Sequence, residues 1–564
     1  MYAFKPTYLL LSFFLTSIFY NSYSQLKKKK NGMVVSDSKL ASEIGVKILK
    51  SGGNAVDASI ASAFALAVTY PAAGNIGGGG FVVYFNAEKE SVTTIDFREK
   101  APLKSYEKMY IDETGQFQTK KSSYGIRSIG VPGTVDGLYH FHKKYGKLPW
   151  KVLIQPSIDL SKDGFKMTNG LFNSIKNQNF HQSKKYLKTY FNNKNGNLVK
   201  PGELWIQESL SKTLTAIRDN GRDGFYKGWV ADEIVNFMKK NNGLIDHNDL
   251  IKYKSTERIP VRGNYRGFEV FSMPPPSSGG ITLISMLNIL ENEDFKKIKL
   301  NSTMFIHLLV ETMKIGFYNR AKYLGDPDFN PNIPIDSLLS KKYSKIMFKS
   351  INKKKASKSD PNVLNKNSES DQTTHISVID KDGSSVSLTY TLEESFGSGI
   401  GTNKLGFLFN NEMGDFNPVP GLTDKFGLIG TKPNTIAPGK RMLSSMTPTI
   451  VTKNMKPYLI IGSPGGRTII NTVLQSIINT IDYNMNLDDA IEASKFHHQW
   501  LPDKIVFEKS KFSSETLNDL SKMGHDFNFT TRLGNLMGII YDEKENIFIG
   551  ATDSASSDGA AIGY

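Results

Sequence analysis

The feature that most constrains the fold of this chain is an abrupt change in composition and hydrophobic pattern near residue 372. Residues 351–372 (INKKKASKSDPNVLNKNSESDQ) are rich in Lys, Ser, Asn and Asp and contain few large apolar side chains. Such a composition is typical of a mobile surface linker. Immediately afterwards Thr374–Ile379 and Ser385–Leu392 have strand patterns, and the Asp382-Gly383 turn between them predicts a β-hairpin. Any fold of this chain must therefore contain a polar linker followed directly by a β-hairpin that begins at Thr373-Thr374.

Thr373 would become a reactive N-terminal residue if the chain were cut before it. A Thr hydroxyl is a poor nucleophile unless a base lies beside it, and a Thr at a chain N-terminus carries its own base, the α-amino group. The unperturbed pKa of that amine is about 7.7–8.0. The same hydroxyl can break the peptide bond after Gln372 by attacking the preceding carbonyl. Taken alone, the pattern also fits an ordinary strand, because Thr favours strands in any fold.

The composition supports a large folded protein and excludes several kinds of site. The chain has 564 residues, 39% hydrophobic and 11% aromatic, so it can bury a large core, as one elaborated fold or as two closely packed parts. The net charge of +16 comes mainly from scattered Lys and indicates a solvated basic surface, with no nucleic acid as partner. The absence of cysteine excludes disulfides, thiolate metal sites and a Cys nucleophile.

Residues 1–24 have the layout of a cleavable signal peptide. Lys5 precedes the apolar run Tyr8–Tyr20, and small residues lie just before Gln25. An uncleaved membrane anchor is the alternative, although the run is short for a span of about 20 residues. No other stable membrane span is expected, since the apolar segment Ala55–Thr69 contains an Asp and predicts a buried helix. We expect the mature protein to be secreted or periplasmic.

Hydrophobic periodicity predicts a mixed α and β chain with no internal repeat. Residues 134 to about 350 have mostly helical patterns. The other predicted helices are Ser38–Ser51, Ala55–Thr69 and Leu487–Phe496, and further strands are predicted over Phe81–Phe85, Val92–Phe97 and Pro457–Ile461.

The glycine-rich segment Gly462–Gly466 follows one of these strands. Acyl transfer needs an oxyanion hole, which backbone N–H groups can supply where no side chain interferes. The segment can provide such donors, but by itself it fits a plain Gly/Pro turn equally well.

Six motifs, taken together and in this order, resemble the γ-glutamyltranspeptidases. They are Gly74–Phe81, Asp96-Phe97-Arg98-Glu99, Thr373-Thr374-His375 with the turn Asp380–Gly383, Leu443-Ser444-Ser445-Met446, Gly462–Gly466 and Phe496–Pro502. The resemblance runs from about residue 33 to the C-terminus. It implies an N-terminal-nucleophile hydrolase with a four-layer αββα sandwich. It also implies self-cleavage into a large subunit, 25–372, and a small catalytic subunit, 373–564, which form one intertwined fold.

Matching these motifs residue by residue implies a role for each site position. Thr373 resembles the nucleophile, Thr391 the second Thr whose hydroxyl bonds to it, and Gly465 and Gly466 the oxyanion donors. The residues implied to bind a γ-glutamyl group are Arg98, Ser444 and Ser445 for its α-carboxylate, and Glu393, Glu412 and Asp415 for its α-ammonium. A guanidinium suits a carboxylate because both are planar and can pair through two hydrogen bonds.

The sequence departs from the family pattern at three places. Glu393 stands where many members have Asn, and Asp553-Ser554-Ala555 stands where many have Asp-Pro-Arg. Pro418–Lys440 resembles the loop that covers the glutamyl pocket, with Phe426 where others often have Tyr or Trp. The histidines His375, His497 and His498 are expected to be structural, because the N-terminal amine already supplies the base.

The resemblance implies hydrolysis or transfer of the γ-glutamyl group of glutathione and related compounds, through a γ-glutamyl-Thr373 ester. The acceptors would be water, amino acids or peptides, and no cofactor or metal is implied. Two alternatives stay open at this point. One is a glutaryl-cephalosporin acylase of the same fold, and the other is a binding protein of that fold that is never cleaved.

Overall fold

The computed structural model describes residues 27–176, 186–361, 372–425 and 429–564. The predicted signal peptide and Phe426 lie outside these ranges. Within them, no helix is both long enough and apolar enough to cross a membrane.

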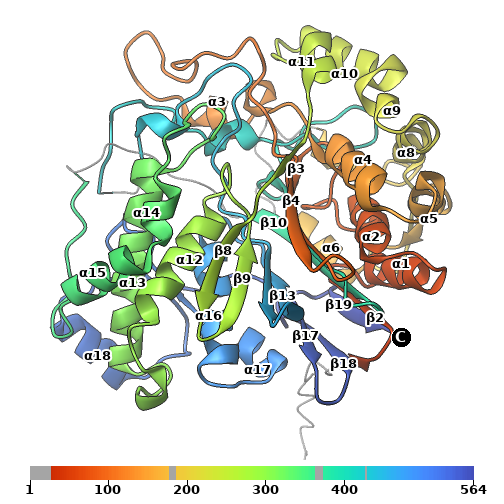
Figure 1. Ribbon diagram of the computed structural model, residues 1–564. Helices are drawn as coiled ribbons and strands as arrows, with labels where there is room; N and C mark the ends of the chain where they lie inside the picture. Colours follow the sequence, from red (N-terminus) through yellow and green to blue (C-terminus); the bar gives the residue numbers. More distant parts are fainter. Residues whose placement is uncertain (1–26, 177–185, 362–371, 426–428) are drawn as a thin grey trace, which may run out of the picture.

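Two seven-stranded antiparallel sheets lie at the centre of the protein (Figure 1). The first sheet runs in the order β19 (Ala560–Gly563), β2 (Gly32–Ser36), β10 (Gln372–Asp380), β11 (Ser385–Glu393), β3 (Gly79–Asn86), β4 (Ser91–Asp96) and β7 (Thr256–Arg258). The second runs β1 (Lys27–Lys29), β18 (Ile547–Thr552), β17 (Met537–Asp542), β13 (Lys456–Gly462), β12 (Thr449–Lys453), β9 (Phe268–Ser272) and β8 (Val261–Tyr265).

The sheets pack face to face through apolar side chains from both. This inner core includes Val35, Val83 and Ile379 from the first sheet and Ile450, Ile460 and Ile539 from the second. Because strand side chains alternate between faces, the opposite face of each sheet also needs a cover, and helices provide it.

Helices cover both outer faces, which makes the four-layer αββα sandwich that the resemblance implied. The first sheet is covered by α1 (Lys39–Lys50), α2 (Ala55–Thr69) and α4 (Thr134–Tyr145), with α5 (Trp150–Asp163) and α8 (Glu208–Asn220) outside them. The second is covered by α12 (Gly279–Leu290), α16 (Thr468–Ile481) and α17 (Leu487–Glu492), with α13 (Thr303–Tyr323) packed on α12.

The predicted Ala-rich helix is confirmed as α2, and every one of its residues is buried. It begins at a capping box, in which the Asn54 side chain accepts from the Asp57 N–H and the Asp57 carboxylate accepts from the Asn54 N–H. Because alanines and other small side chains occur on every face of α2, the helix can lie between other helices and the strands β10 and β11.

Shorter elements complete the described chain. They are α3 (Thr119–Ser123), α6 (Asn169–Lys176), α7 (Leu187–Tyr190), α9 (Asp223–Tyr226), α10 (Gly228–Lys240), α11 (His247–Lys252), α14 (Ile335–Leu339), α15 (Lys341–Ser350), α18 (Ser514–Lys522), β5 (Phe165–Lys166), β6 (Leu204–Trp205), β14 (Phe496–His497), β15 (Ile505–Glu508), β16 (Phe527–Thr530), and the 3-10 turns η1 (Ile126–Ser128), η3 (Phe295–Lys297), η5 (Glu412–Asp415) and η6 (Lys432–Asn434).

Two secondary-structure predictions need correction. The helix predicted to reach Phe496 ends at Glu492, because Phe496 pairs as a strand with Phe507 of β15. Within the region predicted to be mostly helical, residues 256–272 form strands that complete both sheets. In both cases tertiary pairing overrides the local pattern.

The prediction of a mobile linker over 351–372 is wrong for its first part. The Ala356 N–H donates to the Met523 carbonyl over 2.8 Å, and Ala356 is buried. The Ser359 N–H donates to Asp503 over 3.1 Å. Residues 352–359 therefore dock on the part of the chain that follows Thr373, while 362–371 lie outside the described residues.

Candidate active site

A small pocket brings together most of the predicted site residues. Its lining consists of Arg98, Thr373, Thr391, Glu393, Glu412, Asp415, Ser444, Ser445 and Gly466, with Met446 and Ile469, which the sequence did not single out. Gly465 is next to the pocket in the chain but does not line it. Gln372 is the first residue of β10.

A β-bulge aims Thr373 and Thr391 into this pocket. Gln372 pairs with Glu393 and Thr374 pairs with Tyr390, so two residues of β11 oppose Thr373 alone. Such a bulge bends the strand and redirects its side chains. Thr373 and Thr391 are both buried, and the Thr391 hydroxyl accepts from the Glu393 N–H over 2.8 Å.

The loop between β13 and α16 forms another wall of the pocket. Gly465 and Gly466 have φ angles of +129° and +53°, which favour glycine. A Cβ on Gly465 would lie 2.5 Å from the Thr468 hydroxyl, which donates to the Gly465 carbonyl. The loop therefore leads tightly into the first turn of α16, where the positive end of a helix favours negative charge.

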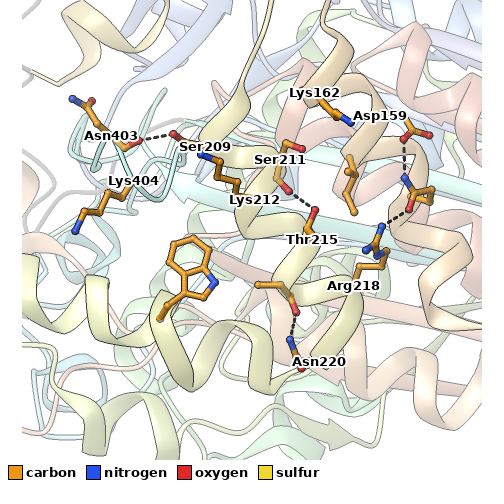
Figure 2. Close-up of a pocket in the computed structure, with 14 residues that line it drawn as sticks. Asp159, Lys162, Ser209, Ser211, Lys212, Thr215, Arg218, Asn220, Asn403 and Lys404 are labelled. Atoms are coloured by element: carbon orange, nitrogen blue, oxygen red, sulfur yellow. Dashed lines mark hydrogen bonds between the residues drawn. The ribbon is translucent and has the colours of Figure 1, made fainter.

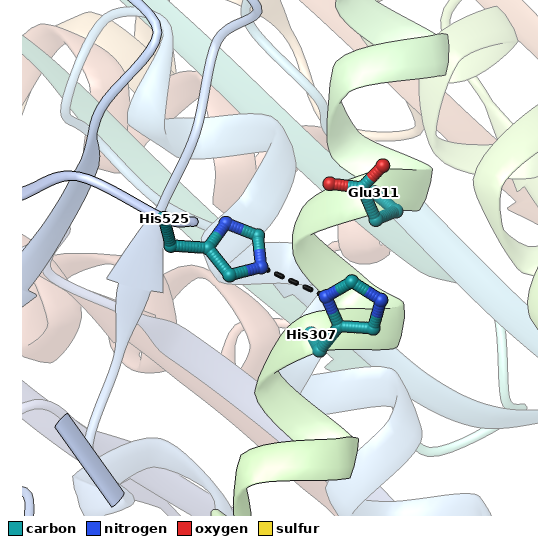
Figure 3. A group of neighbouring side chains, drawn as sticks. All are labelled: His307, Glu311 and His525. Atoms are coloured by element: carbon teal, nitrogen blue, oxygen red, sulfur yellow. Dashed lines mark hydrogen bonds between the residues drawn. The ribbon is translucent and has the colours of Figure 1, made fainter. Parts of the chain in front are cut away.

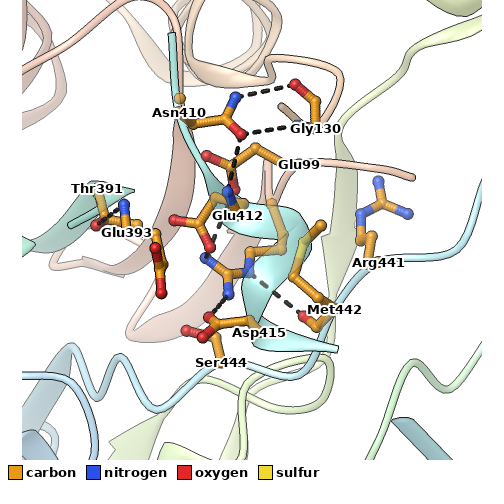
Figure 4. Close-up of polar contacts among 12 residues, drawn as sticks. Glu99, Gly130, Thr391, Glu393, Asn410, Glu412, Asp415, Arg441, Met442 and Ser444 are labelled. Carbon is orange, nitrogen blue, oxygen red and sulfur yellow. Dashed lines mark hydrogen bonds and ion pairs between the residues drawn. The ribbon is translucent and has the colours of Figure 1, made fainter. Parts of the chain in front are cut away.

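Arg98 is buried and pairs with three acids at one side of the pocket. Figure 4 shows these acids, Glu99, Glu412 and Asp415, close to one another. Its Nη1 lies 2.6 Å from Glu412 Oε2 and 3.5 Å from Glu99 Oε2, and its Nη2 pairs with Asp415. Its Nε donates to the Met442 carbonyl over 3.3 Å. Its backbone is fixed as well, because its N–H donates to Asp96 over 3.0 Å.

Acidic side chains surround Arg98. Burial is the main cause that raises the pKa of Glu99, to about 8, while Arg98 acts in the opposite direction. Burial also raises the pKa of Glu412 well above its usual value, again against the effect of Arg98. With Asp415 and Glu393 nearby, acidic groups outnumber the arginine. A ligand that carries both a cation and an anion complements such a site.

Glu393 is held in an unusual backbone conformation at the end of β11. Its φ is +81°, a region that costs a non-glycine residue on the order of 1–3 kcal/mol. Its carboxylate accepts from the Asn411 side chain, which also donates to the Ser123 carbonyl over 3.0 Å. No sequence pattern marks Asn411, because the contact depends on how η5 folds back on β11.

The paired serines are positioned by the proline-rich segment before α12. The Ser444 N–H donates to the Pro276 carbonyl over 2.9 Å, and the Ser278 hydroxyl donates to the Ser444 carbonyl over 2.6 Å. Arg320 of α13, which the sequence did not single out, donates to the Ser445 hydroxyl over 3.1 Å and to Ser278 over 2.9 Å.

Comparison with known proteins identifies the family. A profile described as gamma-glutamyltranspeptidase matches residues 41–564. The chain belongs to the gamma-glutamyltranspeptidase family. It is 43% identical over 544 residues to the glutathione hydrolase proenzyme of Escherichia coli (strain K12), which covers 95% of this chain and 92% of that protein.

Solved structures agree with this family assignment. The crystal structure of Helicobacter pylori gamma-glutamyltranspeptidase is 42% identical with a TM-score of 0.55, and covers 58% of this chain and 93% of that one. A cephalosporin acylase from Bacillus halodurans has a TM-score of 0.83 at 25% identity, and covers 98% of this chain and 99% of that one. The αββα fold is therefore shared by transpeptidases and acylases.

In this gamma-glutamyltranspeptidase-family chain, the three predicted structural histidines are buried and none lines the pocket. His375 bonds through Nδ1 to the Thr389 hydroxyl over 2.7 Å, and burial lowers its pKa to about 3. Burial likewise lowers the pKa of His497, to about 4, and that of His498. Neutral rings in hydrogen-bonded interior positions fit a structural role.

The segment Asp553-Ser554-Ala555, where the sequence departs from the family pattern, is held by ion pairs and hydrogen bonds. Asp553 is buried, pairs with Arg532 and lies 3.5 Å from the Lys495 ammonium. Ser554 donates to Glu492 through its N–H over 2.6 Å and through its hydroxyl over 2.8 Å.

His307, Glu311 and His525 are residue types that bind metals, and their side chains gather away from the pocket (Figure 3). Their ligand atoms lie within 4.8 Å of one another. His307 Nδ1 is 2.8 Å from His525 Nε2, its Nε2 donates to the Asn352 carbonyl over 2.8 Å, and Glu311 pairs with Lys314 over 3.1 Å. The group thus forms an interior polar network under the docked segment 352–359.

A wider pocket lies on the outer helices α5 and α8 (Figure 2). Its lining includes Lys162, Lys212, Arg218 and Trp229, and it contains none of the predicted site residues. The predicted site residues therefore gather in the small pocket around Thr373 and not in this one.

Proposed function

We propose that this protein is a self-cleaving γ-glutamyl hydrolase and transferase that acts on glutathione and related γ-glutamyl compounds. The observation that carries the proposal is the small pocket, where Thr373 and Gly466 lie beside Arg98 and its acids. The relatives named glutathione hydrolase proenzymes support both the substrate and the processing.

We assign the first chemical step to the cut between Gln372 and Thr373. The Thr373 hydroxyl attacks the Gln372 carbonyl carbon, the C–N bond between the two residues breaks as its nitrogen takes up the hydroxyl proton, and water then hydrolyses the resulting ester. This releases the large subunit, 25–372, with a free carboxylate and leaves Thr373 with a free α-amine. That amine is the base that the hydroxyl otherwise lacks.

Turnover then follows the same acyl chemistry. The amine takes the Thr373 hydroxyl proton while the oxygen attacks the γ-carbonyl carbon, and backbone N–H groups of Gly465 and Gly466 stabilise the oxyanion. The leaving amine departs with the proton, and a γ-glutamyl-Thr373 ester remains. Water gives glutamate, whereas the amine of an amino acid or peptide gives a new γ-glutamyl amide. Thr391 orients the nucleophile.

Substrate recognition divides between the two charges of the γ-glutamyl group. Arg98 with Ser444 and Ser445 binds the α-carboxylate, and Glu393, Glu412 and Asp415 accept from the α-ammonium. A glutaryl group lacks that ammonium, so the acids favour γ-glutamyl over glutaryl substrates. The likeness to a cephalosporin acylase keeps acylase activity as the alternative, and hydrolysis rates of γ-glutamyl-p-nitroanilide and glutaryl-p-nitroanilide distinguish the two.

We further propose that residues 1–24 are removed during export and that the mature protein is secreted or periplasmic. The n-region, apolar run and small residues before Gln25 support this location. Cell fractionation, with N-terminal sequencing of the large subunit, is the test. A large subunit that still begins at Met1 in the membrane fraction would favour the anchor instead.

N-terminal sequencing of the purified small subunit tests the central proposal. We expect its sequence to begin Thr-Thr-His, from Thr373. Thr373→Ala should give one uncut chain without turnover, whereas Thr373→Ser, which keeps a hydroxyl, should still be cut. Two chains from Thr373→Ala would exclude self-cleavage by Thr373, and an uncut, soluble wild-type chain would favour a binding protein.

A further inference from the structure

A buried carboxylate outside the pocket joins the two halves of the proposed catalytic apparatus. Asp37 follows β2 and is 1% exposed. It accepts hydrogen bonds from the Thr374 hydroxyl over 2.7 Å, from the Asn535 side-chain amide over 2.7 Å and from the Ser556 hydroxyl over 2.9 Å. These donors come from three separate segments of the predicted small subunit, while Asp37 belongs to the large one.

The first of these bonds holds the residue next to the proposed nucleophile. Thr374 is the next residue after Thr373, at the point where the β-bulge makes the pairing of β10 irregular. A bulge leaves the local backbone with fewer ladder hydrogen bonds, so a side-chain anchor there has more influence on the direction of Thr373. Asp37 supplies that anchor on the side of Thr374.

The second bond connects Asp37, through Asn535, to the loop between β13 and α16 that carries Gly465 and Gly466. The Asn535 N–H donates to the Ser463 hydroxyl over 2.9 Å, and Ser463 in turn donates to the Pro464 carbonyl over 2.7 Å. Gly534 packs so tightly here that a Cβ on it would lie 2.8 Å from the Ser463 hydroxyl. Asp37 therefore holds Asn535, and Asn535 holds the start of the loop that carries Gly465 and Gly466.

A carboxylate suits this position because it accepts several hydrogen bonds at once and donates none. Burial is the main cause that raises the pKa of Asp37, to about 6, and the three side-chain donors act against this rise. Above that pH the ionised form keeps all three donors satisfied. An Asn in place of Asp37 would present an NH₂ group at one of the two oxygen positions, so the Thr374 hydroxyl or the Asn535 amide would have to turn round and accept, and the present geometry of the contacts would be lost.

We propose that Asp37 is a positioning residue. Across the subunit boundary, it fixes the position of β10, which carries Thr373, relative to the loop that carries Gly465 and Gly466. The inference rests on the proposed function, since it assigns no new reaction. It adds that a residue of the large subunit, outside the six motifs quoted above, affects the chemistry of the small one.

The test compares Asp37→Asn with Asp380→Asn. Asp380 is the matched control, because it is also a buried aspartate, at the other end of β10, and accepts from the Ala55 and Ser384 N–H groups over 3.0 Å each. Turnover of γ-glutamyl-p-nitroanilide is measured per processed subunit, with the rate of self-cleavage and the melting temperature. Asp37→Asn should lower kcat by up to about 100-fold, as expected for misplacement by about 1 Å, with little change in KM.

Asp380→Asn should lower the melting temperature and leave kcat per processed subunit unchanged. Thr374→Val removes the hydroxyl without changing the shape and should reproduce the part of the kcat loss that runs through Thr374, whereas Thr374→Ser should retain most of the activity. The double variant Asp37→Asn/Thr374→Val should be little worse than Asp37→Asn alone, because Asp37→Asn already disturbs the contact with Thr374.

Wild-type kcat in Asp37→Asn, or an equal loss in Asp380→Asn, would overturn the inference. A wild-type enzyme that does not turn over the substrate would overturn the proposed function instead. The self-cleavage rates of Asp37→Asn and Asp380→Asn would then still decide the role of Asp37.

Discussion

Arg98 Nη1 lies 2.6 Å from Glu412 Oε2, and both side chains are almost completely buried. Two further acids, Glu99 and Asp415, also pair with this arginine. The guanidinium is thus fixed before any ligand enters, and acidic side chains surround it. A ligand that brings both a carboxylate and a cation complements such a site, and that is the charge pattern of an α-amino acid.

The first prediction concerns this ion pair. Arg98→Gln should raise KM for γ-glutamyl-p-nitroanilide strongly and destabilise the fold by about 3–5 kcal/mol, because buried acids lose their counter-charge. Steady-state kinetics and urea unfolding measure the two effects. Arg262→Gln is the control, since Arg262 is 64% exposed and pairs with Glu269 at the surface. Equal effects of the two substitutions would contradict a special role for Arg98.

A second prediction separates recognition of the ammonium from recognition of the rest of the substrate. Glu393→Gln and Asp415→Asn should each raise KM for γ-glutamyl-p-nitroanilide by about 10- to 100-fold, the loss typical of one hydrogen bond to a charged group. The KM for glutaryl-p-nitroanilide, which has no ammonium, should change little. Glu233→Gln, a change at a surface acid that pairs with Lys404, should affect neither substrate. Parallel losses on both substrates would show that the acids act through structure alone.

The part of this site that sequence could predict is the part built from contiguous motifs. Arg98, Ser444, Ser445 and Gly466 each stand in a short recognisable string, and the pocket brings them together. The αββα fold followed from the same motifs. Periodicity alone gave a mixed chain, because buried strands and buried helices have similar apolar runs.

The contacts that sequence could not predict come from residues brought in by tertiary packing. Asn411 bonds to Glu393, Arg320 to Ser445, and Asp37 to Thr374, and none of these three stands in a motif that the sequence singled out. The polar composition of 351–361 likewise gave no sign that Ala356 docks beside Met523. Composition reports what a segment can bury by itself, whereas docking depends on the surface that it meets.

A third prediction follows from the buried neutral ring of His375. Burial lowers its pKa from 6.5 to about 3, so between these values the unfolded chain binds a proton that the folded protein does not. The contribution of His375 to the free energy of unfolding is complete above pH 6.5. It should fall by about 1.4 kcal/mol per pH unit as the pH falls towards 3. His375→Gln should reduce this slope in urea unfolding between pH 7 and 5. His247→Gln, at an exposed position, should leave it unchanged, and an unchanged slope in His375→Gln would refute the assignment.

The last prediction tests how His375 supports the oxyanion loop. Gly462 ends β13, and a Cβ on it would lie 2.3 Å from ring atoms of His375. Gly462→Ala must therefore displace either the ring or the strand end, and the loop that carries Gly465 and Gly466 begins at the next residue. Overpacking of this kind costs about 1–3 kcal/mol. We expect a lower free energy of unfolding together with a lower kcat.

Two comparisons distinguish this displacement from a general effect of adding a methyl group. Gly538 lies on the neighbouring strand β17, and a Cβ there would meet its nearest atom, Leu487 Cδ1, at 3.2 Å. Gly538→Ala should therefore be tolerated better. In the double variant Gly462→Ala/His375→Ala the missing ring makes room for the new methyl group, so the losses should be smaller than the sum of the two single changes. Strict additivity in unfolding free energy would mean that the glycine and the histidine do not compete for the same space.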